Sequence, residues 1–193
     1  AVGVTDINLD DAKLTCEAVK ALGVKSIALK ADVTNKAEVE TMVKEMISKL
    51  GDIDILCNVA GAIMTGGPFE EQDPAIWAKE VSLNLFSPMF VSAAVLPCMR
   101  KKGKGAIVNI GSGSSHMYIH GVGVYAQAKG ALDVFTKQLA TAEAKNRIRV
   151  NCVAPGPAPT NFIKAPDKQA VIEFLKKELP LGRATSAQDI ANA

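Results

Sequence analysis

The chain has 193 residues, close to the length of one domain, and 48% of them are apolar, which is enough for a sizeable core. Its net charge of +2 argues against a dedicated nucleic-acid binder, and no apolar run approaches the ~20 residues that a membrane span needs. The four cysteines lack the paired spacing of a metal or redox motif, which predicts reduced thiols in a cytoplasmic protein. We therefore expect no metal, no nucleic acid and no membrane partner.

Short β-rich runs alternate with helical periods along the chain. The expected strands, with compositions that favour burial on both faces, span 1–6, 26–33, 52–61, 105–112 and 147–156. The expected helices span 9–22, 36–50, 74–101 and 124–145. This alternation predicts one α/β domain over residues 1–193, with a doubly wound parallel sheet between helices on both faces.

Polar and small residues follow each expected strand. Parallel α/β sheets bind ligands beyond the carboxyl ends of their strands, so the candidate site comprises Asp6, Asp32, Val33, Asn58, Gly61, Ser112, Pro155 and Gly156. An acid at Asp6 can accept hydrogen bonds from the ribose hydroxyls of NAD, and it would repel the 2′-phosphate of NADP. Asp6 could instead cap the helix at 9–22, although Asn8 or Asp10 would also serve.

Tyr125 and Lys129 are the most specific candidate acid/base pair in the sequence. Four residues apart on an expected helix, they share a face, and the ammonium can stabilise a phenolate whose pKa starts near ~10. A tyrosine tuned in this way can exchange a proton with an alcohol oxygen near neutral pH. The other tyrosine, Tyr118, has Val122 at that offset, so the pattern occurs once. Ser112 ends a strand thirteen residues before Tyr125.

With these residues in order, the sequence resembles the classical short-chain dehydrogenase/reductase family. That family carries a serine after a strand like "AIVNIGS" and Tyr-x-x-x-Lys thirteen residues later, as Ser112, Tyr125 and Lys129 stand here. The other matching segments are "ADV" (31–33), "CNVAG" (57–61), "VSLNL" (81–85), "APGPAPT" (154–160) and "PLGRATSAQDIANA" (180–193). Val59 replaces the second asparagine of the family's Asn-Asn-Ala-Gly.

The resemblance implies a Rossmann-like three-layer α/β/α fold and a role for each matching residue. Tyr125 would pass the proton, Lys129 would lower its pKa and bind the nicotinamide ribose, and Ser112 would steady the substrate oxygen. Asn84 would hold a water that links Lys129 to solvent. The implied cofactor contacts are Asp6, Asp32, Val33, Asn58, Ala60, Gly61, Tyr125, Lys129, Pro155, Gly156, Ala158 and Thr160. A structural role for Asn58, bridging neighbouring strands, stays open, as does a simple turn at Pro155 and Gly156.

The sequence departs from the family pattern at its two ends. Family members open with a strand and a Thr-Gly-x-x-x-Gly-x-Gly turn that cradles the pyrophosphate, whereas "GAIMTGG" (61–67) follows the wrong strand here. We therefore expect a first strand–helix unit and a last strand to be missing from this sequence. Residues 161–179 are expected to form a substrate lid within the domain.

The leading hypothesis is a cytoplasmic oxidoreductase that moves hydride between NAD(H) and a small secondary alcohol or ketone, with NADP less favoured. One alternative is an NADPH-dependent 3-oxoacyl-thioester reductase that acts on acyl carrier protein. Another is a non-catalytic fragment that lacks the pyrophosphate loop.

The expected helices 74–101 and 124–145 are apolar on more faces than packing against one sheet requires. The resemblance points the same way, to a homodimer or homotetramer in which these helices form a four-helix bundle between subunits. The alternative is that both helices are simply well buried in a monomer.

Overall fold

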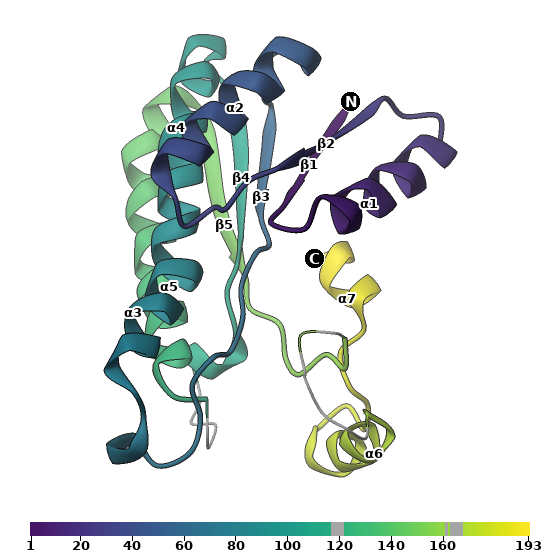
Figure 1. Ribbon diagram of the computed structural model, residues 1–193, viewed down its shortest axis with the longest axis vertical. Helices are drawn as coiled ribbons and strands as arrows, with labels where there is room; N and C mark the ends of the chain where they lie inside the picture. Colours follow the sequence, from purple (N-terminus) through teal and green to yellow (C-terminus); the bar gives the residue numbers. More distant parts are fainter. Residues whose placement is uncertain (117–121, 161, 163–167) are drawn as a thin grey trace.

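The computed structural model describes residues 1–116, 122–160, 162 and 168–193. In these ranges the strands are β1 (Val2–Asp6), β2 (Ser26–Lys30), β3 (Ile55–Asn58), β4 (Gly105–Ile110) and β5 (Ile148–Val153) (Figure 1). The α-helices are α1 (Leu9–Ala21), α2 (Lys36–Leu50), α3 (Pro74–Val81), α4 (Ser87–Lys102), α5 (Val124–Glu143), α6 (Lys168–Glu178) and α7 (Ala187–Asn192). Short 3-10 turns lie at Phe69–Glu71, Gly113–Ser115 and Ala144–Asn146. The expected alternation of strands and helices is confirmed.

Capping residues set the limits of the first two helices. The side-chain oxygens of Asn8 and Asn35 accept hydrogen bonds from the backbone N–H groups of Asp10 (3.1 Å) and Ala37 (3.0 Å), which begin α1 and α2. Gly51 has a φ of 86°, a conformation that strains a residue with a side chain, and it ends α2 at the predicted position.

All five strands are shorter than expected, as β2 and β3 illustrate. The strand predicted at 26–33 ends at Lys30, because the chain turns at Asp32, whose carboxylate accepts the N–H of Thr34 at 2.8 Å. The strand predicted at 52–61 is confined to Ile55–Asn58, because these are the residues of β3 that pair with β4.

The helix predicted at 74–101 is divided by a π turn, Ser82–Phe86, between α3 and α4. In this turn the N–H of Ser87 donates to the carbonyl of Ser82, five residues back, a pattern that recurs at functional sites. By length and composition alone the stretch Pro74–Lys102 could cross a membrane, which differs from the expectation that no run is long enough. Core helices pass the same test, and this stretch contributes Val95 and Met99 to the core.

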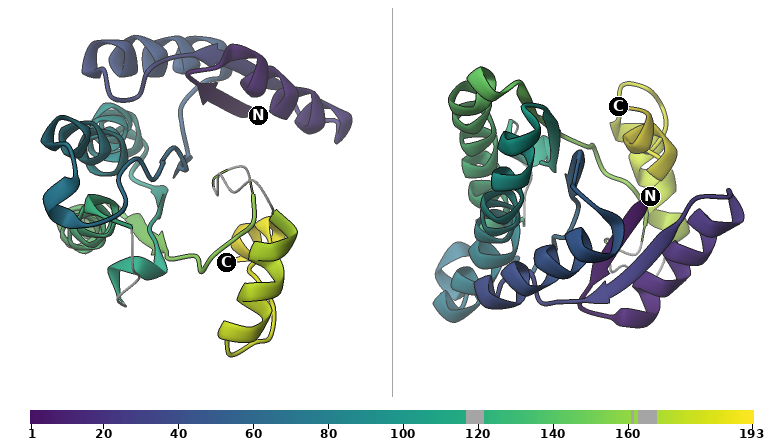
Figure 2. Two further views of the ribbon diagram at one scale, coloured as in Figure 1. Left: turned by 60° about the horizontal axis from the view of Figure 1, so that its bottom comes forward. Right: turned by 90° about the horizontal axis from the view of Figure 1, so that it is seen from above.

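The paired strands are parallel, as predicted, but they form two hydrogen-bonded groups. β1 pairs with β2, and the second group has the order β3–β4–β5. Helices α2, α4 and α5 lie on one side of these strands, and α1 and α7 lie on the other (Figures 1 and 2). The core forms where α2 and α4 meet the strands, and it includes Val39, Val43, Val95, Met99, Ile107 and Ile148.

A cleft of about 920 Å³ lies between β1 and β3. Within the part of the chain that the structure describes, each of these strands is hydrogen-bonded to a neighbouring strand on one side only. Side chains of α2 and α4 line the cleft between them. The prediction of burial on both faces is therefore wrong for these two strands. Ile55 in β3 is 65% exposed and Val59 just after it is 68% exposed, because they border the cleft rather than another strand.

Candidate active site

Segments that follow β3, β4 and β5 meet the first turn of α5 at the lower end of the molecule in Figure 1. This is the sheet edge where the sequence predicts the site, since the carboxyl ends of the parallel strands point there.

Tyr125 lies in the first turn of α5 and is only 5% exposed. Burial raises its pKa, a hydrogen bond with Ser112 works in the opposite direction, and the negative charge of Glu80 raises the pKa further. The ring of Phe162 lies against the phenol, with 5.9 Å between centroids. The phenol is therefore a shielded group with one polar neighbour at its reacting end.

Lys129 lies one turn further along α5 and is 3% exposed. Its Nζ donates a 2.7 Å hydrogen bond to the carbonyl of Ile110, at the end of β4, and lies 5.7 Å from the centroid of the Tyr125 ring. Burial lowers the pKa of Lys129 to about 8, while the charges of Cys152 and Asp133 act to raise it. The sequence predicts a lowered pKa for Tyr125, but here the desolvation of the phenolate outweighs this more distant ammonium.

Asn84 is the fully buried centre of the π turn. Its Nδ2 donates to the carbonyls of Ala62 (2.8 Å) and Glu80 (2.9 Å), and its Oδ1 accepts the N–H of Ala62 at 3.3 Å. These bonds tie the turn to the segment after β3. A Cβ on Gly61 would lie 2.9 Å from Asn84 Oδ1 and 3.4 Å from Lys129 Nζ, so the glycine backbone stands where both side chains converge.

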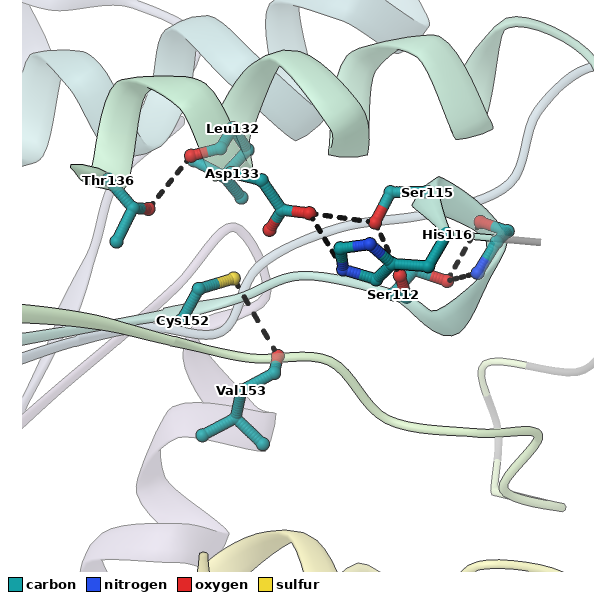
Figure 3. Close-up of polar contacts among 9 residues, drawn as sticks. Ser112, Ser115, His116, Leu132, Asp133, Thr136, Cys152 and Val153 are labelled. Atoms are coloured by element: carbon teal, nitrogen blue, oxygen red, sulfur yellow. Dashed lines mark hydrogen bonds and ion pairs between the residues drawn. The ribbon is translucent and has the colours of Figure 1, made fainter. Parts of the chain in front are cut away.

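Ser112 follows β4, and a second set of polar residues holds its segment (Figure 3). Its Oγ accepts hydrogen bonds from the N–H (3.2 Å) and hydroxyl (2.9 Å) of Ser114, which leaves its own hydrogen to donate. Ser115 Oγ lies 2.7 Å from the Ser112 carbonyl oxygen and 2.9 Å from Asp133 Oδ2 on α5. His116 Nε2 reaches the same Asp133 oxygen at 3.0 Å.

Two buried carboxylates at the site were not singled out by sequence reasoning. Asp133 lies one helical turn after Lys129, and Glu80 lies one turn before Asn84. The i to i+4 offset, which identified Tyr125 with Lys129, would have placed both acids on the faces that carry these residues.

Predicted cofactor-binding residues gather in the cleft between β1 and β3. Its lining includes Asp6, Val33, Asn58, Ala60 and Gly61. Asp6 does not cap α1, because Asn8 is the cap; the Asp6 carboxylate accepts the N–H of Asn8 at 2.8 Å instead. A carboxylate at a strand end accepts hydrogen bonds and so suits the hydroxyls of a ribose. These residues therefore fit a nicotinamide dinucleotide.

The Asn58 side chain bridges strands, which is the structural alternative left open by the sequence. Its Nδ2 donates to Asn109 Oδ1 at 2.8 Å and to Ser92 Oγ at 3.3 Å. Asn109 Nδ2 in turn donates to Thr136 Oγ1 at 2.9 Å, and that hydroxyl donates to the carbonyl of Leu132 at 2.8 Å. A polar chain thus joins β3, β4 and α5 directly beneath the site.

Asp32 lies beside the cleft rather than among its lining residues. One of its carboxylate oxygens accepts the N–H and hydroxyl of Thr34 at 2.8 and 2.7 Å, and its own N–H donates to Glu38. Because its N–H is engaged in this way, the side chain is the part of Asp32 that remains suited to an adenine amino group.

The segment after β5 is hydrogen-bonded to the segment that carries Ser112. The carbonyl of Pro155 accepts the N–H of Gly113 at 2.9 Å, which docks the two segments side by side. Thr160 N–H donates to the carbonyl of Ala158 at 2.7 Å, which closes a tight turn. A Cβ on Gly156 would approach Thr185 Oγ1 to 3.1 Å. The predicted lid at 161–179 lies partly outside the described residues; its described part is Phe162 and the span from 168, which includes α6.

Fold and site together describe an α/β protein with a buried tyrosine and a buried lysine one turn apart on α5, and comparison with known proteins identifies its family. The family model described as "Enoyl-(Acyl carrier protein) reductase" matches residues 1–193. The 7alpha-hydroxysteroid dehydrogenase of Escherichia coli K12 is 34% identical over 100% of this chain and 75% of its own length. The 3-oxoacyl-[acyl-carrier-protein] reductase of Bos taurus is 36% identical over 89% of this chain and 70% of its own length.

Solved structures share the fold over the whole chain. A gluconate 5-dehydrogenase from Burkholderia cenocepacia, in complex with NADP and tartrate, has a TM-score of 0.91 at 29% identity and covers 100% of this chain and 75% of its own. A 7alpha-hydroxysteroid dehydrogenase complexed with NADH and 7-oxo glycochenodeoxycholic acid has a TM-score of 0.92 at 32% identity, with 100% and 74% covered. The chain belongs to the short-chain dehydrogenase/reductase family of oxidoreductases, and its expected Rossmann-like fold class is confirmed.

Proposed function

We propose that this protein oxidises a secondary alcohol, or reduces the corresponding ketone, with NAD(H). The observation that carries the proposal is the convergence of Ser112, Tyr125 and Lys129 at one sheet edge, beside a cleft that bears Asp6. The nicotinamide, when bound, accepts or supplies the hydride. The cleft residues Asp6, Ala60 and Gly61 would hold the adenosine half of the dinucleotide.

The protein side chains manage the proton that accompanies the hydride. In the oxidation, Tyr125 removes the hydroxyl proton of the alcohol while the carbon–hydrogen bond breaks. Ser112 donates its remaining hydrogen to the substrate oxygen and so fixes the distance from that oxygen to the phenol. Lys129 supplies the positive charge that stabilises the phenolate, and the backbone of Gly61 lets it approach Asn84.

Asp6 supports NAD over NADP as the cofactor. It is exposed at the end of β1, in the cleft lining, where a second anion from a 2′-phosphate would meet its carboxylate. The relatives favour neither choice, since one is recorded with NADP and another with NADH.

A second candidate is the reduction of 3-oxoacyl thioesters with NADPH. The similarity to the Bos taurus reductase favours it, and the charge of Asp6 argues against its cofactor. The two candidates predict different cofactor preferences, so one assay separates them.

The test is turnover of NAD and NADP with a panel of secondary alcohols, ketones and 3-oxoacyl thioesters, followed by absorbance of the reduced nicotinamide. Calorimetric titration with NADH measures binding without turnover. We expect NADH to bind and at least one alcohol–ketone pair to turn over with a preference for NAD. Binding without turnover across the panel would favour a non-catalytic binding protein, and a preference for NADPH with thioesters would favour the second candidate.

Two further proposals concern where the protein works and in what assembly. We place it in the cytoplasm, on the ground that its four cysteines are free thiols, which persist in a reducing compartment. We also propose a homodimer or homotetramer built on α4 and α5, supported by the exposed apolar side chains Phe86 and Val134 on these helical stretches.

A further inference from the structure

Glu80 is a completely buried acid for which the proposed reaction has no use. It lies in α3, one turn before Asn84, with a relative exposure of 0%. Within the described part of the chain, no lysine, arginine or histidine forms an ion pair with it. Burying a carboxylate is costly unless hydrogen bonds replace its lost hydration. The hydrogen-bond donors around the Glu80 carboxylate must therefore offset the cost of its burial.

Among the described residues, the hydrogen-bond donors to the Glu80 side chain belong to the segment that follows β3. Its Oε1 accepts the backbone N–H of Met64 at 2.7 Å and that of Thr65 at 3.4 Å, and its Oε2 accepts the hydroxyl of Thr65. Three donors converge on one carboxylate, which can act only as an acceptor when ionised. The segment is therefore fixed to α3 by a buried charge.

Thr65 carries this attachment across to α5. Its Oγ1 accepts the backbone N–H of Val124 at 3.2 Å, at the start of the helix. The preceding residue, Gly123, has no side chain to cap the helix, and a Cβ there would lie 2.2 Å from Thr65 Oγ1. The hydroxyl of Thr65 thus takes the place of a local cap and receives a first-turn N–H that would otherwise lack an acceptor. Tyr125 is the next residue.

We propose that Glu80 is a positioning residue for the proposed reaction: through Thr65 it fixes the first turn of α5, and its charge acts on the phenol of Tyr125. The rate effects of this role depend on the proposed function, but its effect on the phenol does not. Glu80 and Asn84 would then serve the site from one face of the same helical stretch, the first through the start of α5 and the second through the segment after β3.

Charged and titratable groups reach the Tyr125 phenol from three elements. Ser112 lies on the segment after β4, Lys129 on α5 itself, and Glu80 on α3. The negative charge of Glu80 raises the pKa of Tyr125, and the hydrogen bond from Ser112 lowers it. Asp133 and Cys152 act on Lys129 in turn. Removing the charge of Glu80 while keeping its shape should therefore let the phenol ionise at lower pH.

The first experiment is an ultraviolet difference titration of tyrosine ionisation, which needs no turnover. Tyr118→Phe removes the chain's other tyrosine and provides the background, so that the signal belongs to Tyr125. We expect Glu80→Gln in this background to lower the midpoint, whereas Glu71→Gln, which removes the same charge from an exposed position, leaves it unchanged. Equal midpoints for Glu80→Gln and the background would overturn the electrostatic part of the proposal.

The second experiment separates position from charge with a pair of variants at Thr65. Thr65→Val is close in shape but loses the hydroxyl, and Thr65→Ser keeps it. We expect Thr65→Val to lower kcat about tenfold or more, because a small misplacement of a reacting group slows the reaction strongly. The KM for NAD and the pH dependence of the oxidation rate should stay unchanged. Thr65→Ser should restore most of the rate. Equal rates for the two variants would overturn the positioning role.

The outcomes distinguish this inference from the proposed function. If the unsubstituted protein turns over no substrate, the proposed function is contradicted. If Glu80→Gln still shifts the midpoint of Tyr125 ionisation in that case, the electrostatic effect of Glu80 on Tyr125 is supported independently. If Glu80→Gln loses its circular dichroism signal, the Thr65 pair decides the positioning role alone. In that case a Thr65→Val protein with full activity overturns the proposal.

Discussion

The phenol oxygen of Tyr125 is the atom on which the proposed proton transfer depends. Tyr125→Phe removes this oxygen and keeps the ring that packs against Phe162. We expect the substitution to lower kcat/KM by about 10²- to 10⁴-fold, the usual loss when a general acid or base is removed, without changing the thermal midpoint by more than a few degrees. Turnover and circular dichroism are the measurements, and Tyr118→Phe is the matched control. Retention of more than about a tenth of the rate would contradict the assignment.

The carboxylate of Asp6 stands where the two cofactors differ. Asp6→Ala removes both its attraction for ribose hydroxyls and its repulsion of a 2′-phosphate, so we expect weaker use of NAD and a smaller bias against NADP. The measurement is the ratio of kcat/KM for NAD to that for NADP. Asp10→Ala, which removes a charge from the exposed surface of α1, should leave the ratio unchanged. If the ratio is the same in the unsubstituted protein, Asp6→Ala and Asp10→Ala, then Asp6 does not determine the preference between NAD and NADP.

Burial of Lys129 makes a prediction about stability and pH. Its pKa falls from 10.5 to about 8 on folding, so the unfolded chain holds this proton more tightly than the folded one between these values. The penalty is complete below pH 8, shrinks as the pH rises through this window, and is gone above 10.5. Lys129→Met should therefore be more stable at pH 7 by up to about 3 kcal/mol.

Urea unfolding at several pH values tests this prediction. The difference in unfolding free energy between Lys129→Met and the unsubstituted protein should narrow as the pH rises above 8. Lys137→Met, at an exposed position of α5, is the control and should show no such trend. A constant difference at all pH values would mean that the desolvation of Lys129 costs little.

Spacing along the chain was enough to predict which residues of the site come together, but not how buried acids support them. Tyr125 and Lys129 share a helical face whatever the surrounding fold does, so the pair could be predicted from its offset. The partners of Glu80 precede it by fifteen and sixteen residues, and those of Asp133 precede it by seventeen and eighteen. Such contacts depend on where loops pass in three dimensions, which composition and periodicity do not specify.

At the scale of elements, α4 and α5 carry apolar residues that the core does not use. Val134 on α5 is 55% exposed, and Phe86, which leads into α4, is 44% exposed. We expect these helices to bury that surface against a second copy of the chain, so light scattering at micromolar concentration should report a dimer or tetramer. Phe135→Glu should shift it toward monomer, and Lys137→Glu on the same helix should not. An assembly that survives Phe135→Glu would place the interface elsewhere.

The elements themselves were largely predictable because their signals are local. The apolar periodicity of residues 36–50 and the glycine at 51 predicted α2 with its observed limits. Both signals are local, because side-chain periodicity and a glycine with positive φ act over about one helical turn. The π turn was not predicted, because hydrogen bonding that shifts by one residue leaves the apolar pattern of 74–101 almost unchanged. The predicted strands overran because their last residues resemble strand residues but have no pairing partner.

At the scale of the whole molecule, β1 and β3 each present an unpaired backbone edge to the cleft. Unpaired edges with apolar residues are templates for strand addition, so we expect the isolated polypeptide of residues 1–193 to self-associate on warming. Ile55→Lys places a charge at a position that is 65% exposed, and it should reduce the light scattering that follows mild heating. Ile55→Val is the control. Equal scattering by the two variants would show that the edge of β3 is not where chains meet.

The polar chain beneath the site has a direction. Asn58 donates to Asn109, Asn109 to Thr136, and Thr136 to the carbonyl of Leu132, so every hydrogen points from β3 toward α5. An amide can take part because it carries a donor and an acceptor on opposite arms, and a carboxylate cannot because it carries only acceptors. Asn109→Asp would therefore replace the donor to Thr136 by an acceptor, and the Thr136 hydroxyl would have to turn its hydrogen from the Leu132 carbonyl to the new carboxylate. The exchange of a single side-chain group in β4 would thus weaken the attachment of α5, the helix that carries Tyr125, to the sheet.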